Sequence, residues 1–308
     1  MGNTKSTLSV PKDVKYESHK SARNVLENIG IEIYKEIEKT IPHKDQLIGT
    51  LSKAQFHDGL HKAVGLGVIP GPEDSCKLSH KFHTNIITED GRDPCFGRNQ
   101  KRFDENEGFE CSKSRIKGNE NNRNGGSCAP PRRQHMCDKN LEALNESNTQ
   151  NVHDLLGNVL VTAKYEGDYI INNHPHKGTS EVCIALARSF ADIGDIVRGR
   201  DMFKSNDNVE KGLKKVFDKI HKKLRTQEKN YYNNTGNNVN YAKLREAWWT
   251  ANRDQVWRAI TCNAPDKAEY FVYKSGSLSN FSNPKCGHDE GIVPTNLDYV
   301  PQFLRWYN

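Results

Sequence analysis

Apolar side chains recur every three or four residues in several long stretches of this chain, which is the spacing of an amphipathic α-helix. The first stretch runs from Lys20 to Ile41 and stops at Pro42, a residue that ends helices. A second helical stretch is expected after it, with a buried side made of Leu47, Ile48, Leu51, Leu60 and Val64. Glycines and prolines between positions 65 and 72 then break the pattern. The pattern predicts an N-terminal helical segment over residues 1–75.

Four more amphipathic stretches lie in the second half of the chain. Their apolar positions cover residues 155–163, 182–193, 209–224 and 241–260, with a break expected inside the last. Thr179 or Ser180 is a suitable N-cap for the second of them. Four such helices can bury their apolar stripes together, so a helical bundle is predicted over residues 146–262. Residues 263–308 are predicted to be a loop until a new helix begins at Tyr299, as the start of a truncated further unit.

Residues 76–145 show no such periodicity and hold five of the eight cysteines. The region is rich in Asn, Gly, Arg and Lys, so it cannot bury enough apolar surface to order itself without cross-links. An even number of dispersed cysteines without a C-x-x-C pair favours disulfides and an oxidising compartment. The alternative is free thiols in a cytosolic protein. The cysteines concerned are Cys76, Cys95, Cys111, Cys128, Cys137, Cys183, Cys262 and Cys286.

The N-terminal sequence does not support secretion into an oxidising compartment. No apolar leader follows Met1, and no segment is long and apolar enough to cross a membrane. The first six residues, MGNTKS, even fit an N-myristoylation pattern, which would place the chain in the cytosol. The net charge of +6 is modest for 308 residues. It does not indicate nucleic acid, but it permits anionic partners such as sulfated glycans.

One predicted helix carries a strong excess of positive charge. Its apolar stripe should face the core, so most of its cations should point outward and could neutralise a sulfated polysaccharide. A solvated lysine-rich face is the alternative. The candidate ligand-binding residues are Lys211, Lys214, Lys215, Lys219, Lys222, Lys223 and Arg225, against the single acid Asp218. A secondary basic group lies in the cysteine-rich region and comprises Arg98, Lys101, Arg102, Lys113, Arg115 and Lys117.

Catalytic and metal-binding patterns are weak. His57 and His61 approach an H-E-x-x-H zinc motif, but Asp58 stands in place of the glutamate, so surface histidines are the preferred interpretation. His80 and His83 are no stronger. No nucleophile elbow, Walker or dinucleotide fingerprint occurs, so no enzyme activity, cofactor or metal is expected. Trp248, Trp249 and Trp257 could form a carbohydrate platform, yet helical spacing favours a place in the core.

Nine short runs resemble one family, in family order. The chain is similar to the N-terminal segment plus the alpha-class Duffy-binding-like domain of the Plasmodium falciparum erythrocyte membrane protein adhesins encoded by var genes. The runs are Cys76–Asn85, Asp93–Arg98, Glu110–Ser112, Cys128–Arg133, Cys137–Leu141, Ala187–Ile196, Arg245–Trp249, Val256–Cys262 and Asp298–Trp306.

The resemblance implies an all-α Duffy-binding-like fold. It has an irregular, disulfide-bonded first subdomain (76–145), a helical-bundle second (146–262) and a truncated third (263–308). It also implies an adhesin on the surface of the infected erythrocyte, exported without a leader, with its membrane span elsewhere in the protein. Implied partners are heparan sulfate, blood-group antigens, complement receptor, serum proteins and host antibodies, in cytoadhesion and rosetting.

Two alternatives to glycan binding remain. The chain could recognise a host protein through variable loops such as Arg115–Gly126, or it could be a spacer between binding domains. Many disulfide pairings are open. We expect Cys111–Cys128 nested within Cys95–Cys137, then Cys183–Cys262, with Cys76 and Cys286 as the remainder. Many alpha-class domains have two close cysteines where this chain has only Cys286, so the partner of Cys286 stays open.

Overall fold

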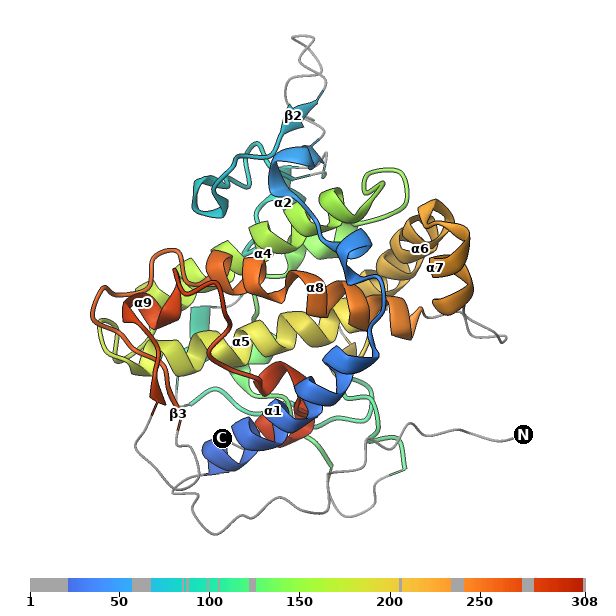
Figure 1. The fold of residues 1–308 in the computed structure, drawn as a ribbon. Helices are drawn as coiled ribbons and strands as arrows, with labels where there is room; N and C mark the ends of the chain where they lie inside the picture. The colour runs from blue at the N-terminus through green and yellow to red at the C-terminus, as the bar shows by residue number, and fades with distance from the viewer. Residues whose placement is uncertain are drawn as a thin grey trace.

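Three long helices form the centre of the molecule (Figure 1). They are α4 (Val152–Asn173), α5 (Glu181–Arg198) and α8 (Ala242–Ile260). The computed structural model describes residues 22–56, 68–84, 86, 89–98, 100–104, 106–121, 126–204, 207–233, 241–272 and 280–306. The predicted all-α class is confirmed.

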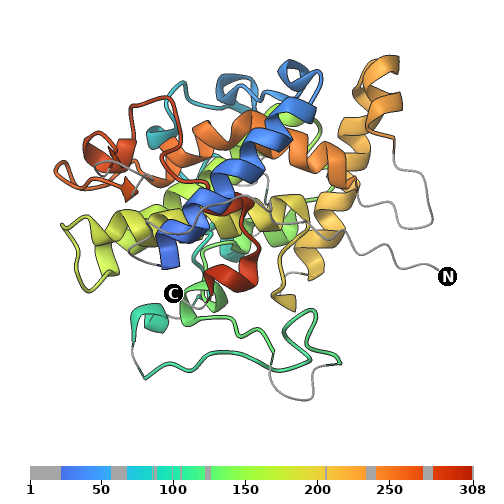
Figure 2. The same cartoon turned by 60° about the horizontal axis from the view of Figure 1, so that its bottom comes forward.

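The other elements surround these three helices. Helix α1 (Ala22–Thr40) crosses one side, and α6 (Asp207–Lys223) and α7 (Thr226–Tyr231) lie at one edge (Figures 1 and 2). Two short antiparallel pairs join β1 (Gln55–Phe56) to β2 (Ile69–Pro70) and β3 (Phe271–Val272) to β4 (Asn280–Phe281). Single α-helical turns are α2 (Glu89–Arg92), α3 (Pro131–Gln134), α9 (Pro284–Gly287) and α10 (Gln302–Arg305). The 3₁₀ turns are η1 (Lys44–Leu47), η2 (Leu51–Lys53), η3 (Ser75–Lys77), η4 (Gln100–Phe103), η5 (Lys139–Ala143) and η7 (Leu297–Tyr299).

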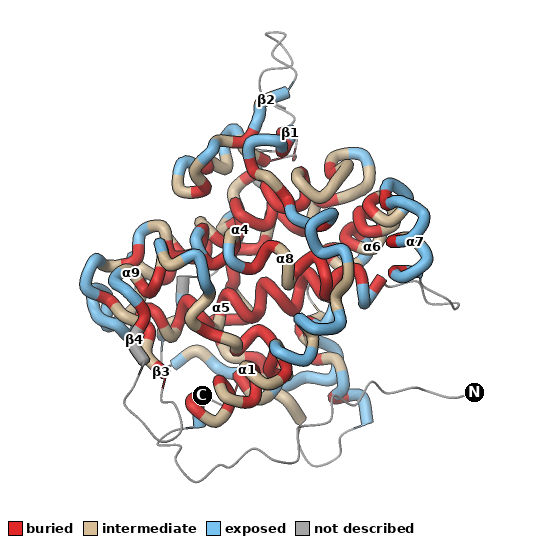
Figure 3. The backbone as a smooth tube through the Cα atoms, viewed as in Figure 1, coloured by how far each residue is buried: buried red, intermediate tan, exposed pale blue. Residues whose placement is uncertain are grey.

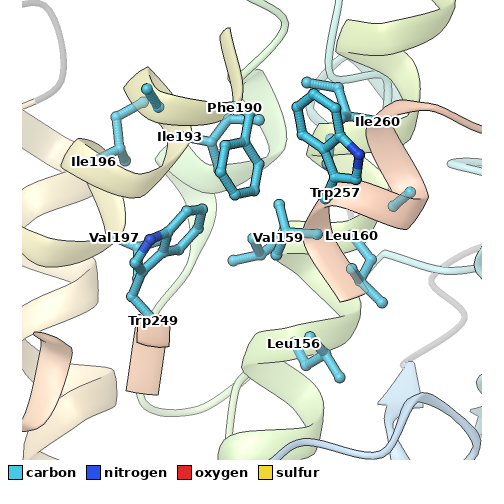
Figure 4. Packing of buried hydrophobic residues seen from close by; sticks show 14 of the residues in the cluster. Leu156, Val159, Leu160, Phe190, Ile193, Ile196, Val197, Trp249, Trp257 and Ile260 are labelled. Atoms are coloured by element: carbon cyan, nitrogen blue, oxygen red, sulfur yellow. The ribbon is translucent and has the colours of Figure 1, made fainter. Parts of the chain in front are cut away.

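The core lies between the facing sides of the three central helices, which are the most continuously buried part of the chain (Figure 3). The ring of Phe190 lies between Trp249 and Trp257, at centroid distances of 5.1 and 5.3 Å (Figure 4). Helix α4 comes so close to the end of α8 that a Cβ at Gly167 would lie 2.0 Å from the Ile260 carbonyl oxygen. The prediction that the tryptophans belong to the core is confirmed.

Local signals set the ends of α4 and α5, and the predicted N-cap of α5 is among them. The Asn151 side chain caps α4 by accepting from the backbone N–H groups of His153 and Asp154. Ser180 occupies the N-cap position of α5, and the neighbouring Thr179 hydroxyl accepts from the Glu181 N–H at 3.2 Å. Gly199 ends α5 in the left-handed region, with φ of 74°.

The second predicted helix is wrong over the described residues 44–56. This stretch forms η1, η2 and β1 instead, because polar side chains of the central helices satisfy its backbone. The N–H of Gly49 donates to Asn252 Oδ1 at 2.7 Å, and the N–H of Gln55 donates to Asp154 Oδ1 at 3.0 Å. Leu60 and Val64 lie outside the described residues.

Two further expectations need correction. Helix α8 continues through Val256 to Ile260 without the expected break. No long helix begins at Tyr299: the chain forms η7 and then α10, whose N-cap is Pro301.

All eight cysteines are paired, but two expected pairs are exchanged. Cys95–Cys137 and Cys111–Cys128 form as expected. The expected Cys183–Cys262 and Cys76–Cys286 pairs are wrong. The end of α8 lies beside η3, so Cys76 joins Cys262, and the start of α5 lies beside α9, so Cys183 joins Cys286. The Cα atoms are 5.4 Å apart in each bridge. The subdomain boundaries after residues 75, 145 and 262 stay predictions.

Candidate functional site

The candidate basic surface is the outer face of α6, at the edge of the molecule (Figure 1). The inner face of α6 is buried and consists of a stripe of apolar side chains. A Cβ at Gly212 would lie 2.1 Å from the Leu144 carbonyl oxygen, so only glycine lets α6 approach the η5 segment this closely. The buried stripe comprises Val209, Leu213, Val216, Phe217 and Ile220.

The predicted cations lie away from that stripe. Lys211, Lys215 and Lys222 are separated by four and seven residues, which places them along one face of the helix. Lys223 and Arg225 are also exposed, whereas Lys214 and Lys219 are half-buried. The expectation that most of these side chains point outward is therefore met for five of the seven.

Acidic neighbours neutralise part of this face. Lys214 pairs with Glu210 at 3.7 Å, Lys215 with Glu146 at 3.3 Å, and Lys222 with Asp218 at 2.5 Å. Lys219 donates to the Glu146 carbonyl oxygen at 2.7 Å. Burial alone would raise the pKa of Asp218, but hydrogen bonds from Lys222 and Tyr241 lower it, so this acid is charged at neutral pH. The sequence reasoning had counted Asp218 alone.

Two cations of this face, and Arg225 at the N-cap of the following helix α7, are available to a ligand. Within the described part of the chain, Lys211, Lys223 and Arg225 form no ion pair. Surface pairs such as Lys215–Glu146 are worth only about 0–1 kcal/mol, so a polyanion could also displace them.

The secondary basic group does not assemble into one surface. Arg102 is buried and pairs with Glu166 at 2.7 Å, and Arg98 pairs with Asp138 and with Glu142. Both arginines are therefore held in ion pairs, Arg102 in the interior and Arg98 half-buried. Lys101, Lys113 and Arg115 are exposed, and Lys117 is half-buried and donates to the Asp201 carbonyl oxygen at 3.1 Å.

A buried ionic layer, which the sequence reasoning missed, connects α5 with its surroundings. Asp192 accepts from Arg132 at 2.6 Å and from Arg305 at 2.7 Å. Asp195 pairs with Arg305 and with Arg198. Burial alone would raise the pKa of Asp192, but the positive charges of the nearby arginines, Arg132 most strongly, hold that pKa at about 2. Two carboxylates three residues apart, Asp192 and Asp195, among the apolar residues of α5 were the available signal.

Metal and membrane features are few. In the described residues, no three His, Cys, Asp or Glu side chains are placed to hold a metal ion together. His57 and His61 lie outside those residues. Burial lowers the pKa of both His80 and His83. None of the described helices combines the length and the apolar character that crossing a bilayer requires.

Comparison with known proteins gives matches on both parts of the chain. Residues 126–305 match the Duffy binding domain, and residues 21–55 match the N-terminal segments of PfEMP1. The chain belongs to the PfEMP1 family of Duffy-binding domains. The NTS-DBL1α and CIDRγ double domain of PfEMP1 from the P. falciparum varO strain is 58% identical with a TM-score of 0.88, covering 94% of this chain and 43% of that one.

More distant proteins also match this chain. A DBLβ domain of PfEMP1 bound to human ICAM-1 is 27% identical with a TM-score of 0.69, covering 93% of this chain and 60% of that chain. The Duffy receptor beta form of Plasmodium knowlesi is 25% identical over 189 residues, or 58% of this chain and 14% of the receptor. The chain thus spans about half the length of the two PfEMP1 structures and a small part of the Duffy receptor. Their Duffy-binding domains are receptor-binding adhesin modules, and PfEMP1 is exposed on the erythrocyte surface.

One of the two longest runs behind the PfEMP1 resemblance has a structural role. In Ala187–Ile196, Asp192 and Asp195 hold the buried arginines, and the Ser189 hydroxyl donates to Glu166 at 2.7 Å. The buried polar residues of this run therefore serve the fold.

Proposed function

We propose that this chain is an adhesion module that binds acidic glycans of host erythrocytes, heparan sulfate first, through the outer face of α6. The observation that supports this most is an exposed row of cations, three of them without ion pairs among the described residues, opposite a buried stripe. Sulfate groups repeat along a polysaccharide, so several weak contacts would add. Each contact is electrostatic and therefore sensitive to salt.

A heparin column tests the helix face. Changing Lys211, Lys215, Lys222 and Lys223 to Glu should lower the NaCl concentration at which the protein elutes. The reason is that four attractive charges become repulsive. Unfolding curves of both proteins should overlap closely, because these side chains are exposed and outside the core.

The matched control changes four exposed lysines of the N-terminal segment, Lys35, Lys39, Lys44 and Lys53, to Glu. The net charge changes by the same amount. Elution of the control should stay closer to that of the parent protein. Equal shifts in both variants would mean that only net charge matters, and the α6 site would be rejected.

Erythrocyte binding tests the biological ligand. The proposal includes exposure on the infected erythrocyte and a role in rosetting. Binding of the folded chain to erythrocytes should fall after heparinase treatment and should differ between blood-group types if blood-group antigens contribute. A chain that binds no erythrocytes under any condition would instead be a spacer.

The loop of residues 106–121 supports a second candidate, recognition of a host protein. It touches the first turn of α6, where Lys117 pairs with Asp207 at 3.8 Å. It carries an aromatic ring, Phe109, that is 59% exposed, and Lys113 and Arg115 of the same loop are also exposed. Exposed aromatic and arginine side chains are typical of protein-binding hot spots. Binding that survives glycosidase treatment and is lost in Phe109→Ala would favour this candidate over the glycan.

A further inference from the structure

A cavity of about 550 Å³ lies between α3, η4 and the first turns of α5, on a different surface from α6. Three arginines from three elements line it: Arg102, Arg132 and Arg188. Phe103, Pro130 and Pro131 supply apolar surface beside them. A cavity of this size suits one or two sugar rings.

Arg188 is the unusual member. It is half-buried on α5, and no carboxylate of the described residues forms an ion pair with it. Burial, followed by the positive charge of Arg132, lowers its pKa to about 10. A lowered pKa in a base means that its charge destabilises the folded protein at neutral pH. A neutralising partner in the cavity would remove that cost.

Arg132 has spare donor capacity in the same place. Its Nη1 donates to Asp192 at 2.6 Å and to Ser189 at 3.3 Å. The residue is only 8% exposed, and its buried Nη2 has no hydrogen-bond partner among the described residues. An unsatisfied buried guanidinium N–H is costly, so this donor also favours an added acceptor.

The two buried carboxylates nearest the cavity are already paired with arginines. Asp192 is shared with Arg305, and Glu166 is occupied by Arg102. Glu181, which also lines the cavity, is exposed and lies 3.8 Å from His176. The cavity therefore contains more positive charge than its described surroundings neutralise.

We propose that this cavity binds the carboxylate or sulfate group of an acidic sugar residue between Arg132 and Arg188. Guanidinium groups match the planar, paired oxygens of carboxylates and the oxygens of sulfates. The flat apolar surfaces of Phe103, Pro130 and Pro131 can cover the sugar ring. This site does not depend on the basic face of α6.

Calorimetric titration tests the proposal with three probes: glucuronate, N-acetylglucosamine 6-sulfate and neutral N-acetylglucosamine. At least one acidic probe should bind about tenfold more tightly than the neutral sugar, and comparing the two acids distinguishes carboxylate from sulfate. Arg188→Gln should weaken that binding by about tenfold or more, since a hydrogen bond to a charged group is lost. Arg258→Gln, at an exposed arginine of α8 outside the cavity, should leave it unchanged.

A stability measurement separates binding from a structural role. Without ligand, Arg188→Gln should keep or raise the melting temperature, because an unneutralised charge is removed. Lower stability of Arg188→Gln, or equal binding of all three probes to the parent and Arg188→Gln proteins, would overturn the proposal. The α6 variant with four lysines changed to Glu should still bind the acidic sugar, so failure of one site is distinguishable from failure of the other.

Discussion

At the residue scale, charged side chains hold the interior of this protein together. Asp192, Asp195 and Asp298 are buried, and each accepts hydrogen bonds from one or two buried arginines. Removing one member of such a pair leaves the other charge buried and unpaired in a medium of low dielectric constant. Substitutions in this layer should therefore cost more than substitutions of exposed charges on α6.

Asp192→Asn tests this difference. We expect a loss of about 3–5 kcal/mol of unfolding free energy at neutral pH, because Arg132 and Arg305 lose their shared acceptor charge. Urea unfolding followed by circular dichroism measures the change. Asp254→Asn is the control, since Asp254 is exposed on α8, and it should stay within about 0.5 kcal/mol of the parent protein.

The acid dependence of stability follows from the same carboxyl. A group whose folded pKa is depressed stabilises the fold above its unfolded pKa and loses that contribution as pH falls to the folded pKa. For Asp192 the unfolded pKa is 3.8 and the folded pKa is about 2. The advantage of the parent over Asp192→Asn should shrink by about 2 kcal/mol between pH 5 and pH 2. A constant difference over that range would contradict the assigned ion pairs.

At the element scale, disulfides join segments that local sequence patterns treat separately. Cys76–Cys262 fastens η3 to the end of α8 across a separation of 186 residues, and Cys183–Cys286 fastens α5 to α9. Cys111–Cys128 closes only 17 residues within the irregular region. Longer closed loops restrict the unfolded chain more.

Removal of single bridges should follow this order. Changing both Cys76 and Cys262 to Ser should lower the unfolding free energy by about 3–5 kcal/mol, and the same change at Cys111 and Cys128 by about 2–3 kcal/mol. Thermal unfolding of the two double variants gives the comparison. A larger loss from the short bridge would show that native contacts, rather than chain entropy, determine the order.

At the scale of the whole molecule, α1 is an integral part of the fold. Its Glu27 is buried and accepts from the Thr295 hydroxyl at 2.6 Å, from the Asn296 N–H at 2.8 Å, and from the Tyr270 hydroxyl. A Cβ at Gly30 would lie 2.2 Å from the Asn296 carbonyl oxygen, so the helix and residues 295–296 are in direct contact. The N-terminal segment and the Duffy-binding part should therefore unfold together.

Substitutions of Glu27 test this docking. Burial raises the pKa of Glu27 even though the Asn296 N–H, Thr295 and Tyr270 lower it, so a neutral amide is a close substitute. Glu27→Gln should stay within about 1 kcal/mol of the parent, and Glu27→Ala should lose about 2–3 kcal/mol by leaving buried donors without an acceptor. Glu36→Ala, on the exposed side of α1, is the control. A separate early unfolding step of α1 in the parent protein would contradict the joint unfolding.

The sequence by itself determined the helices and the family. Apolar spacing located α1, α4, α5, α6 and α8, because burial of one face imposes a helical period on the chain. The motif runs identified the Duffy-binding fold. The same spacing placed the cations of α6 on an outer face, where the helical period alone is sufficient.

Only the tertiary structure decided which distant residues meet. Two of the disulfide pairs differ from those expected. The second predicted helix is a set of turns whose backbone bonds to Asn252 and Asp154. Arg98 and Arg102, predicted to lie on a basic surface, form ion pairs. The tertiary structure also brought Arg132 and Arg188 to one cavity. The periodicity of the sequence shows only which face of its own helix a residue occupies. Pairing and neutralisation depend on groups far apart in the chain, and these are fixed only when the helices pack.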